Sequence, residues 1–358
     1  MKKKFVFGIL CFMLLCLCAC VTRNEEELWD VNQYERVEDI ISIEKLDLGQ
    51  MSSEGVEVST YKVKYQVDDC TVVSYLSVPD ACIEEQDAYP CIIFNRGGNR
   101  EFGANEPENI AYLAETSGKV IFATQYRGVD GGTGTEEYGG ADLNDVLKLI
   151  DFCEEFAFVD MEQIYMMGVS RGGMMTYMAV REDSRIKKAV VISGLSDAFM
   201  AYATRTDMQE VFKELVGETP KSNPEEYEKR SAVYWAEEIK CPILIIHSKL
   251  DERASFEQAE KMVEALEEAG KEYKFISYED DVHGLHPEDF SIIMVCRTVK
   301  KDAIQNRNIN KFYRGNIMRH LSSLAGAIFM LGEIRAFILP KNRSFLYNTN
   351  IRNSEKGG

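Results

Sequence analysis

The chain is short of positive charge. It contains 41 Lys and Arg residues against 59 Asp and Glu residues, for a formal net charge of −18 over 358 residues. Because nucleic-acid backbones are bound through Lys and Arg, this deficit argues against nucleic acid as the main partner. The hydrophobic content of 45% and the charged content of 28% are those of a globular protein, and the length suits one large domain.

Closely paired cysteines are missing as well after residue 20, where no Cys-x-x-Cys pair occurs. Six of them follow residue 20 and are scattered, mostly within apolar runs: Cys70, Cys82, Cys91, Cys153, Cys241 and Cys296. This spacing argues against a disulfide framework and a zinc site, and it favours buried, unpaired side chains. We therefore expect no metal, and no organic cofactor is required by the chemistry inferred below.

The first twenty residues form an apolar run behind three lysines, with the length of a secretory signal. The run ends in Leu17-Cys18-Ala19-Cys20, which resembles the bacterial lipobox. That resemblance implies cleavage before Cys20 and lipidation of its thiol. We expect residues 1–20 to be a lipoprotein signal peptide and the domain to be exported and anchored in a membrane by lipid, on the outer face of the cell membrane or in the periplasm. An uncleaved anchor helix is the alternative, although the run is short for one.

Strand and helix patterns alternate along most of the remaining chain. Residues 21–54 are polar and acidic, and we expect them to be a tether and lead-in. Residues 58–79 then alternate apolar and polar side chains around Asp68 and Asp69, as in an antiparallel hairpin. From there to about residue 278, apolar runs closed by turns alternate with amphipathic segments. This order predicts an α/β fold with a mostly parallel central sheet that is covered by helices on both faces.

Two segments depart from this order. Residues 197–238 hold aromatic and charged helical stretches between two predicted strands, so we expect a short helical lid insertion there. Residues 297–358 carry 12 Lys and Arg against 3 Asp and Glu, whereas residues 21–296 carry 26 against 56. A frameshift or misplaced stop is one hypothesis for this basic, atypical tail, and a basic surface tail is the other. We accordingly set the catalytic domain at residues 55–296.

Residues 163–180 predict a strand, a sharp turn and a helix, with Ser170 at the turn. The pattern Gly168-x-Ser170-x-Gly172 fits a nucleophile elbow, and Gly173 extends it. Glycines are needed at such a turn because it is crowded, and the helix N-terminus behind the serine favours developing negative charge. The alternative is a serine in an ordinary glycine-rich turn, but the flanking strand and helix favour a nucleophile.

A serine nucleophile needs a base, and histidine is scarce. The chain has only four histidines: His247, His283, His286 and His320. In the α/β-hydrolase fold the acid and the base follow the serine in that order. Asp251 and His283 do so, and each follows a predicted strand. We expect His283 to take the serine proton and Asp251 to hold the imidazole tautomer and stabilise its cation.

Other residues near these positions are weaker candidates. Asp280 and Asp281 are close to His283 in sequence, but sequence neighbours rarely have the geometry to orient a ring. His286 precedes Pro287 and is expected to start a final helix. His247 ends a predicted buried strand, where a structural role is the simpler interpretation.

Acyl transfer also needs hydrogen-bond donors for the oxyanion. One should be the backbone N–H of Arg171, the residue after the nucleophile. The other should come from the glycine-containing loop after the strand at residues 91–94, through the backbone N–H of Arg96 or Gly97. A tight turn without such a role is the alternative for this loop.

These motifs resemble the catalytic domain of the prolyl oligopeptidase family over about residues 56–293. The likeness includes "NRGGNREFG", "YRGVDGGTGTEEYGGADLNDV", "GVSRGGMMTYMA", "YEKRSAVYWAEEIKCPILIIHSKLD" and "DVHGL". The resemblance implies the α/β-hydrolase fold and serine-type hydrolysis through Ser170, Asp251 and His283. Large members carry an N-terminal β-propeller, for which this sequence shows no repeats, so we expect a single catalytic domain. Many members also carry Tyr where this chain has Arg96, so we expect a backbone donor there.

The sequence therefore predicts a serine hydrolase of the peptidase type that cleaves peptide or acyl ester substrates through an acyl-enzyme. A carboxylesterase or a carbohydrate deacetylase with the same triad is the alternative within enzymes. A non-catalytic binding lipoprotein on the same fold is the alternative of another class. The sequence does not indicate an oligomeric state.

Overall fold

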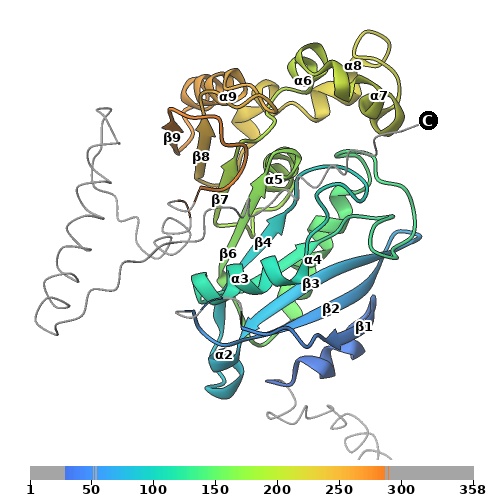
Figure 1. The fold of residues 1–358 in the computed structure, drawn as a ribbon, viewed down its shortest axis with the longest axis vertical. Helices are drawn as coiled ribbons and strands as arrows, with labels where there is room; N and C mark the ends of the chain where they lie inside the picture. Colours follow the sequence, from blue (N-terminus) through green and yellow to red (C-terminus); the bar gives the residue numbers. More distant parts are fainter. Residues whose placement is uncertain (1–28, 51, 53–54, 287–288, 290–358) are drawn as a thin grey trace, which may run out of the picture.

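The computed structural model describes residues 29–50, 52, 55–286 and 289. A nine-stranded sheet runs through the described part in the order β1-β2-β3-β5-β4-β6-β7-β8-β9. Helices lie against both of its faces (Figure 1). The predicted α/β fold with a mostly parallel sheet is confirmed.

The sheet has an antiparallel part and a parallel part. β1 to β3 and the β3–β5 pair are antiparallel, whereas β5, β4, β6, β7, β8 and β9 pair in parallel. The inner parallel strands β5 and β7 are nearly continuous apolar runs, as expected where side chains on both faces are buried, whereas the edge strand β9 is only partly buried. The strands are β1 Ile40–Lys45, β2 Val58–Val67, β3 Cys70–Pro79, β4 Tyr89–Asn95, β5 Val120–Thr124, β6 Val159–Val169, β7 Lys188–Ile192, β8 Ile243–Ser248 and β9 Tyr273–Tyr278.

Two layers of apolar side chains separate the helices from the sheet. Successive residues of β4 show the division, since Ile92 and Phe94 join the cluster that includes α3, while Ile93 joins the cluster that includes α4, α5 and α9. The α-helices are α2 Asp80–Glu84, α3 Pro107–Ser117, α4 Leu143–Glu155, α5 Arg171–Glu182, α6 Ala198–Thr204, α7 Gln209–Phe212, α8 Pro224–Lys229 and α9 Glu257–Glu268.

The stretch before residue 55 contributes more to the fold than we expected. We interpreted residues 21–54 as a tether and lead-in, but β1 extends the sheet and a 3₁₀ helix, η2 Val31–Arg36, packs beneath it. The Tyr34 ring is fully buried and makes edge contacts with Phe156 and Phe158, at 4.7 and 5.5 Å between centroids. Only one face of β1 is buried, so its sequence carries a weak strand pattern.

The expected helical insertion lies between β7 and β8. It consists of α6, η3 Thr206–Met208, α7, a π-helical turn at Lys213–Gly217, α8, and the 3₁₀ turns Ala232–Tyr234 and Ala236–Glu238. Figure 1 shows α6, α7 and α8 gathered at one end of the molecule, away from β1 to β3.

Among the described residues, no helix is both long enough and apolar enough to cross a membrane. The predicted signal peptide, Cys20, His320 and the basic tail lie outside the described residues.

Candidate active site

Ser170 occupies a sharp turn between β6 and α5. Its backbone angles are φ 58° and ψ −122°, a conformation that residues other than glycine rarely adopt. The Ser170 N–H donates to the carbonyl of Ile192 at 2.9 Å, and the Ser170 carbonyl accepts from the Gly173 N–H at 2.9 Å. A strained serine between a strand and a helix is the backbone arrangement that the elbow motif predicts.

The glycines around Ser170 allow close backbone approaches. A Cβ on Gly168 would lie 2.0 Å from the carbonyl oxygen of Gly172, and one on Gly173 would lie 2.6 Å from the Cα of Gly194. A Cβ on Gly172 would lie only 1.9 Å from the carbonyl oxygen of Asn95, at the end of β4. The absence of a side chain at Gly172 therefore lets the loop after β4 rest on the elbow.

Asp251 and His283 meet on neighbouring strand-end loops, after β8 and β9. His283 Nδ1 lies 2.8 Å from Asp251 Oδ2 and 3.0 Å from Oδ1. Asp251 Oδ1 also accepts from the backbone N–H groups of Arg253 and Ala254, at 2.8 and 3.0 Å. Burial alone would raise the pKa of Asp251, but its bonds to His283 and to these N–H groups outweigh burial and lower the pKa. An ionised Asp251 favours the tautomer with the proton on Nδ1, so the basic lone pair of His283 is on Nε2.

The loop that carries His283 lies beside the end of β6. The Gly284 N–H donates to the Ser193 hydroxyl at 3.2 Å, just past β7. A Cβ on Gly284 would lie 3.8 Å from Val169 Cγ1, and Val169 immediately precedes Ser170. The structure thus brings the loops of Ser170, Asp251 and His283 to one edge of the sheet. Ser193 is a supporting residue that our sequence analysis missed.

The other candidate histidines and carboxylates have different surroundings. The His286 ring stacks on Tyr278 with 4.2 Å between centroids, and its Nε2 lies 3.3 Å from Asp280 Oδ1. His247 is 1% exposed, and its Nε2 lies 2.8 Å from the carbonyl of Ala254, in the loop of Asp251. Burial lowers the pKa of His247, so a neutral ring supports that loop.

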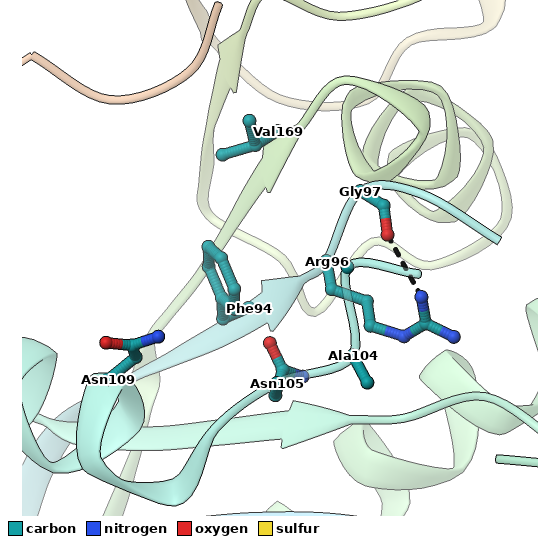
Figure 2. Close-up of a pocket in the computed structure, with 8 residues that line it drawn as sticks. Phe94, Arg96, Gly97, Ala104, Asn105, Asn109 and Val169 are labelled. Carbon is teal, nitrogen blue, oxygen red and sulfur yellow. Dashed lines mark hydrogen bonds between the residues drawn. The ribbon is translucent and has the colours of Figure 1, made fainter. Parts of the chain in front are cut away.

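The loop after β4 is held by the Arg96 side chain. This guanidinium is 1% exposed and donates to the carbonyls of Gln125, Gly97 and Arg100 at 2.9, 3.0 and 2.9 Å. Figure 2 shows the side chain turned back under the loop, with its bond to Gly97 drawn. We had considered only the backbone N–H of Arg96, so this bracing role is a finding of the structure.

A small pocket lies between this loop and the end of β6 (Figure 2). Its volume is about 20 Å³, enough for one water molecule and too little for an amino-acid side chain. Its lining residues are Phe94, Arg96, Gly97, Gly103, Ala104, Asn105, Asn109 and Val169. It is therefore a gap beneath the loop rather than a substrate pocket.

Among the described residues, no group of His, Cys, Asp and Glu side chains could hold a metal ion.

The Arg171 side chain belongs to a buried charge cluster behind the elbow. It is 0% exposed, donates to Glu136 Oε2 at 2.6 Å and to the Gly98 carbonyl at 3.2 Å, and pairs with Asp142. Burial alone would lower the pKa of Arg171, but Asp142 and Glu136 outweigh it and raise the pKa. The guanidinium also lies 4.6 Å from the ring centroids of both Tyr126 and Tyr138. Sequence analysis singled out only the backbone N–H of Arg171.

The chain matches the sequence profile of the prolyl oligopeptidase family, Peptidase_S9, over residues 107–300. That range covers more than half of the 358 residues. The chain belongs to this family. It is an enzyme, a serine hydrolase of the peptidase type.

Known relatives agree with membership of the family. An uncharacterized peptidase, YtmA of Bacillus subtilis, is 29% identical over 233 residues, which are 65% of this chain and 89% of that protein. The solved acylaminoacyl peptidase of Pyrococcus horikoshii superposes with a TM-score of 0.59 at 22% identity, over 71% of this chain and 44% of its own. Acetyl xylan esterase 1 of a Thermoanaerobacterium species superposes with a TM-score of 0.54 at 13% identity, over 75% and 91% of the two chains.

The two structural similarities support the α/β-hydrolase fold of the family. This chain spans less than half of the acylaminoacyl peptidase, so that protein's activity is not transferred to it as a whole. The two solved proteins carry names for different reactions on one fold. The substrate must therefore be argued from the site itself.

Proposed function

We propose that Ser170, Asp251 and His283 form the catalytic triad of this family member. His283 Nε2 takes the proton of the Ser170 hydroxyl as its oxygen attacks the substrate carbonyl. The leaving group receives that proton, an acyl-enzyme forms on Ser170, and water completes the hydrolysis. The 2.8 Å contact between His283 Nδ1 and Asp251 Oδ2, on loops beside the elbow, is the observation that carries this proposal.

The backbone N–H groups of Arg171 and of Gly97 or Arg96 would bind the oxyanion. Arg171 begins α5, where the helix dipole favours negative charge. The close approach of Gly172 to Asn95 supports this assignment, because it brings the loop after β4 against the start of that helix. The substrate class is a peptide or acyl bond. Esters and acetylated carbohydrates are the competing substrates of the same triad.

Labelling with a fluorophosphonate probe tests the triad directly. We expect the purified protein to be labelled, and Ser170→Ala and His283→Ala to lose both labelling and turnover while keeping their fold. His286→Ala is the matched control, since it changes another histidine in the same loop and should keep both. Labelling of Ser170→Ala would refute the nucleophile assignment. No labelling of a folded wild-type protein would favour the binding lipoprotein.

A panel of substrates then separates the reactions. For each substrate, kcat/KM is divided by the rate of the uncatalysed reaction. If the enzyme evolved as a peptidase, this ratio should be higher for peptide amides and acylated amino-acid amides than for p-nitrophenyl acetate. A preference for simple esters or acetylated sugars would assign it to the esterase or deacetylase class instead.

We further propose that residues 1–20 direct export and that Cys20 carries the lipid anchor. The lipobox-like sequence that ends at Cys20 supports this proposal. Mass spectrometry of the mature N-terminus would reveal a lipidated Cys20, and Cys20→Ala should abolish this lipidation. The C-terminal peptide in the same experiment tests whether residues 297–358 are translated as written.

A further inference from the structure

The peptide group between Arg96 and Gly97 carries a candidate oxyanion donor, the Gly97 N–H. Its carbonyl oxygen, on Arg96, lies 3.1 Å from the hydroxyl of Tyr126, which donates to it. In a trans peptide the C=O and N–H bonds point in opposite directions. No cis peptide bond occurs among the described residues. A hydrogen bond that fixes this carbonyl therefore fixes the direction of the Gly97 N–H.

This peptide group lies over the nucleophile elbow. A Cβ on Gly172 would be 2.7 Å from the Arg96 carbonyl oxygen, and Gly172 is only two residues beyond Ser170. The Arg96 carbonyl is thus packed against the start of α5, two residues beyond Ser170, in the neighbourhood where an oxyanion would form.

Tyr126 is itself held firmly. Its side chain is 0% exposed, and the centroid of its ring lies 4.9 Å from the guanidinium carbon of Arg96 and 4.6 Å from that of Arg171. Its backbone N–H donates to Thr124 Oγ1 at 3.0 Å. Its φ of 63° is a left-handed conformation that costs a tyrosine energy, so the surroundings must impose it.

The hydroxyl keeps its proton at the pH of catalysis. Burial raises the pKa of Tyr126 above its ordinary value, although the neighbouring Arg171 and Arg96 oppose this effect. A protonated hydroxyl that faces a carbonyl oxygen can only donate to it.

We propose that Tyr126 is a positioning residue for the oxyanion hole. Its hydroxyl binds the Arg96 carbonyl and so aims the Gly97 N–H at the carbonyl oxygen of a substrate attacked by Ser170. Tyr126 touches no reacting atom, and its role rests on the proposed triad and oxyanion hole.

Tyr126→Phe tests this role in the full chain, because it removes one oxygen and keeps the ring in contact with the two arginines. With p-nitrophenyl acetate we expect kcat to fall about tenfold and KM to change less than about twofold, since loss of a whole oxyanion donor costs about 10²–10³ in kcat. Fluorophosphonate labelling should slow by a similar factor. The pH profile of kcat should keep its shape, because the Asp251–His283 pair is unchanged.

Tyr34→Phe is the matched control. The Tyr34 hydroxyl is also buried and accepts from the Ala157 N–H at 2.8 Å, but it lies under β1, on the helix η2. This variant should lose stability comparably and keep its kcat. An unchanged kcat in Tyr126→Phe, or an equal fall in both variants, would overturn the positioning role and leave the triad standing.

Two further outcomes are distinguishable. If Tyr126→Phe fails to fold, Tyr126→Met also removes the hydroxyl, and a folded Tyr126→Met with wild-type kcat overturns the proposal. If Ser170→Ala still turns over substrate, the proposed function fails first, and the role of Tyr126 fails with it.

Discussion

The two halves of the candidate active site are held in different ways. The half with Ser170 and the loop after β4 rests on a buried cluster of arginines, carboxylates and tyrosines, in which Arg96 and Arg171 are at most 1% exposed. The half with Asp251 and His283 rests on backbone N–H groups and the Ser193 hydroxyl. Large apolar side chains beside it are exposed, with Leu250 at 62% and Val282 at 36%.

This difference matches what each half must do. An oxyanion hole works because its donors are fixed before charge develops, so a rigid, buried support is useful there. In the other half, Asp251 must orient the ring of His283, and that ring must exchange protons with substrate and water. A few hydrogen bonds on partly exposed loops allow both. Breaking the charge cluster behind the nucleophile should therefore cost much stability, whereas breaking the supports of the base should show mainly in activity.

Asp251→Asn should produce the largest effect, a fall in kcat of about 10³–10⁴, because an amide no longer favours the His283 tautomer with the proton on Nδ1. Steady-state kinetics with p-nitrophenyl acetate measures it. A fall of less than tenfold would mean that another group orients His283.

The same variant gives a pH dependence. The folded-state pKa of Asp251 is below its ordinary value, so the carboxylate adds stability above the unfolded pKa of about 4, and this stability is lost as the pH falls through the lower folded value. In urea unfolding, the wild type should therefore have a higher free energy of unfolding than Asp251→Asn at pH 7, and this difference should become smaller below about pH 4. A difference that widens toward acid would contradict the lowered pKa.

Arg171→Met should mark the nucleophile half through stability. It leaves Asp142 buried without the cation that it pairs with and leaves Glu136 with the more distant Arg96, at 3.8 Å, and removing one partner of such a group costs about 3–5 kcal/mol in the free energy of unfolding. Arg100→Met is the matched control, because its pair with Glu214 is about half exposed and should contribute less than about 1 kcal/mol. Equal losses in urea unfolding would show that burial of the cluster does not matter.

Ser193→Ala should have the smallest effect. It removes the hydroxyl that accepts the Gly284 N–H, and we expect a loss of about 1 kcal/mol in stability with a severalfold fall in kcat. Ser59→Ala breaks a bond to Asp80 of 2.7 Å, remote from the site, and should leave kcat unchanged. A normal kcat in Ser193→Ala would mean that the His283 loop is positioned without this bond.

Local patterns allowed much of this arrangement to be predicted. Runs of apolar residues predicted most of the parallel strands, and Ser170, Asp251 and His283 each come within five residues of the end of one, so their loops were expected at one edge. The cluster around Arg171 could not be predicted in this way. It joins Arg96, from the loop after β4, to Tyr126 and Glu136, from the long loop between β5 and α4, and no spacing in the sequence indicates that they meet. The one signal in the sequence was the charged Arg171 itself, directly after the nucleophile.

The place of β1 at the edge of the sheet determines how far the proposed lipid anchor would let the active site reach. If Cys20 is the anchor, the eleven peptide steps from Cys20 to Val31 extend at most about 40 Å. β9 and the His283 loop lie eight strand spacings from β1, roughly another 40 Å at about 4.8 Å per strand. A protein tethered in this way works within a shell of about 80 Å around the membrane.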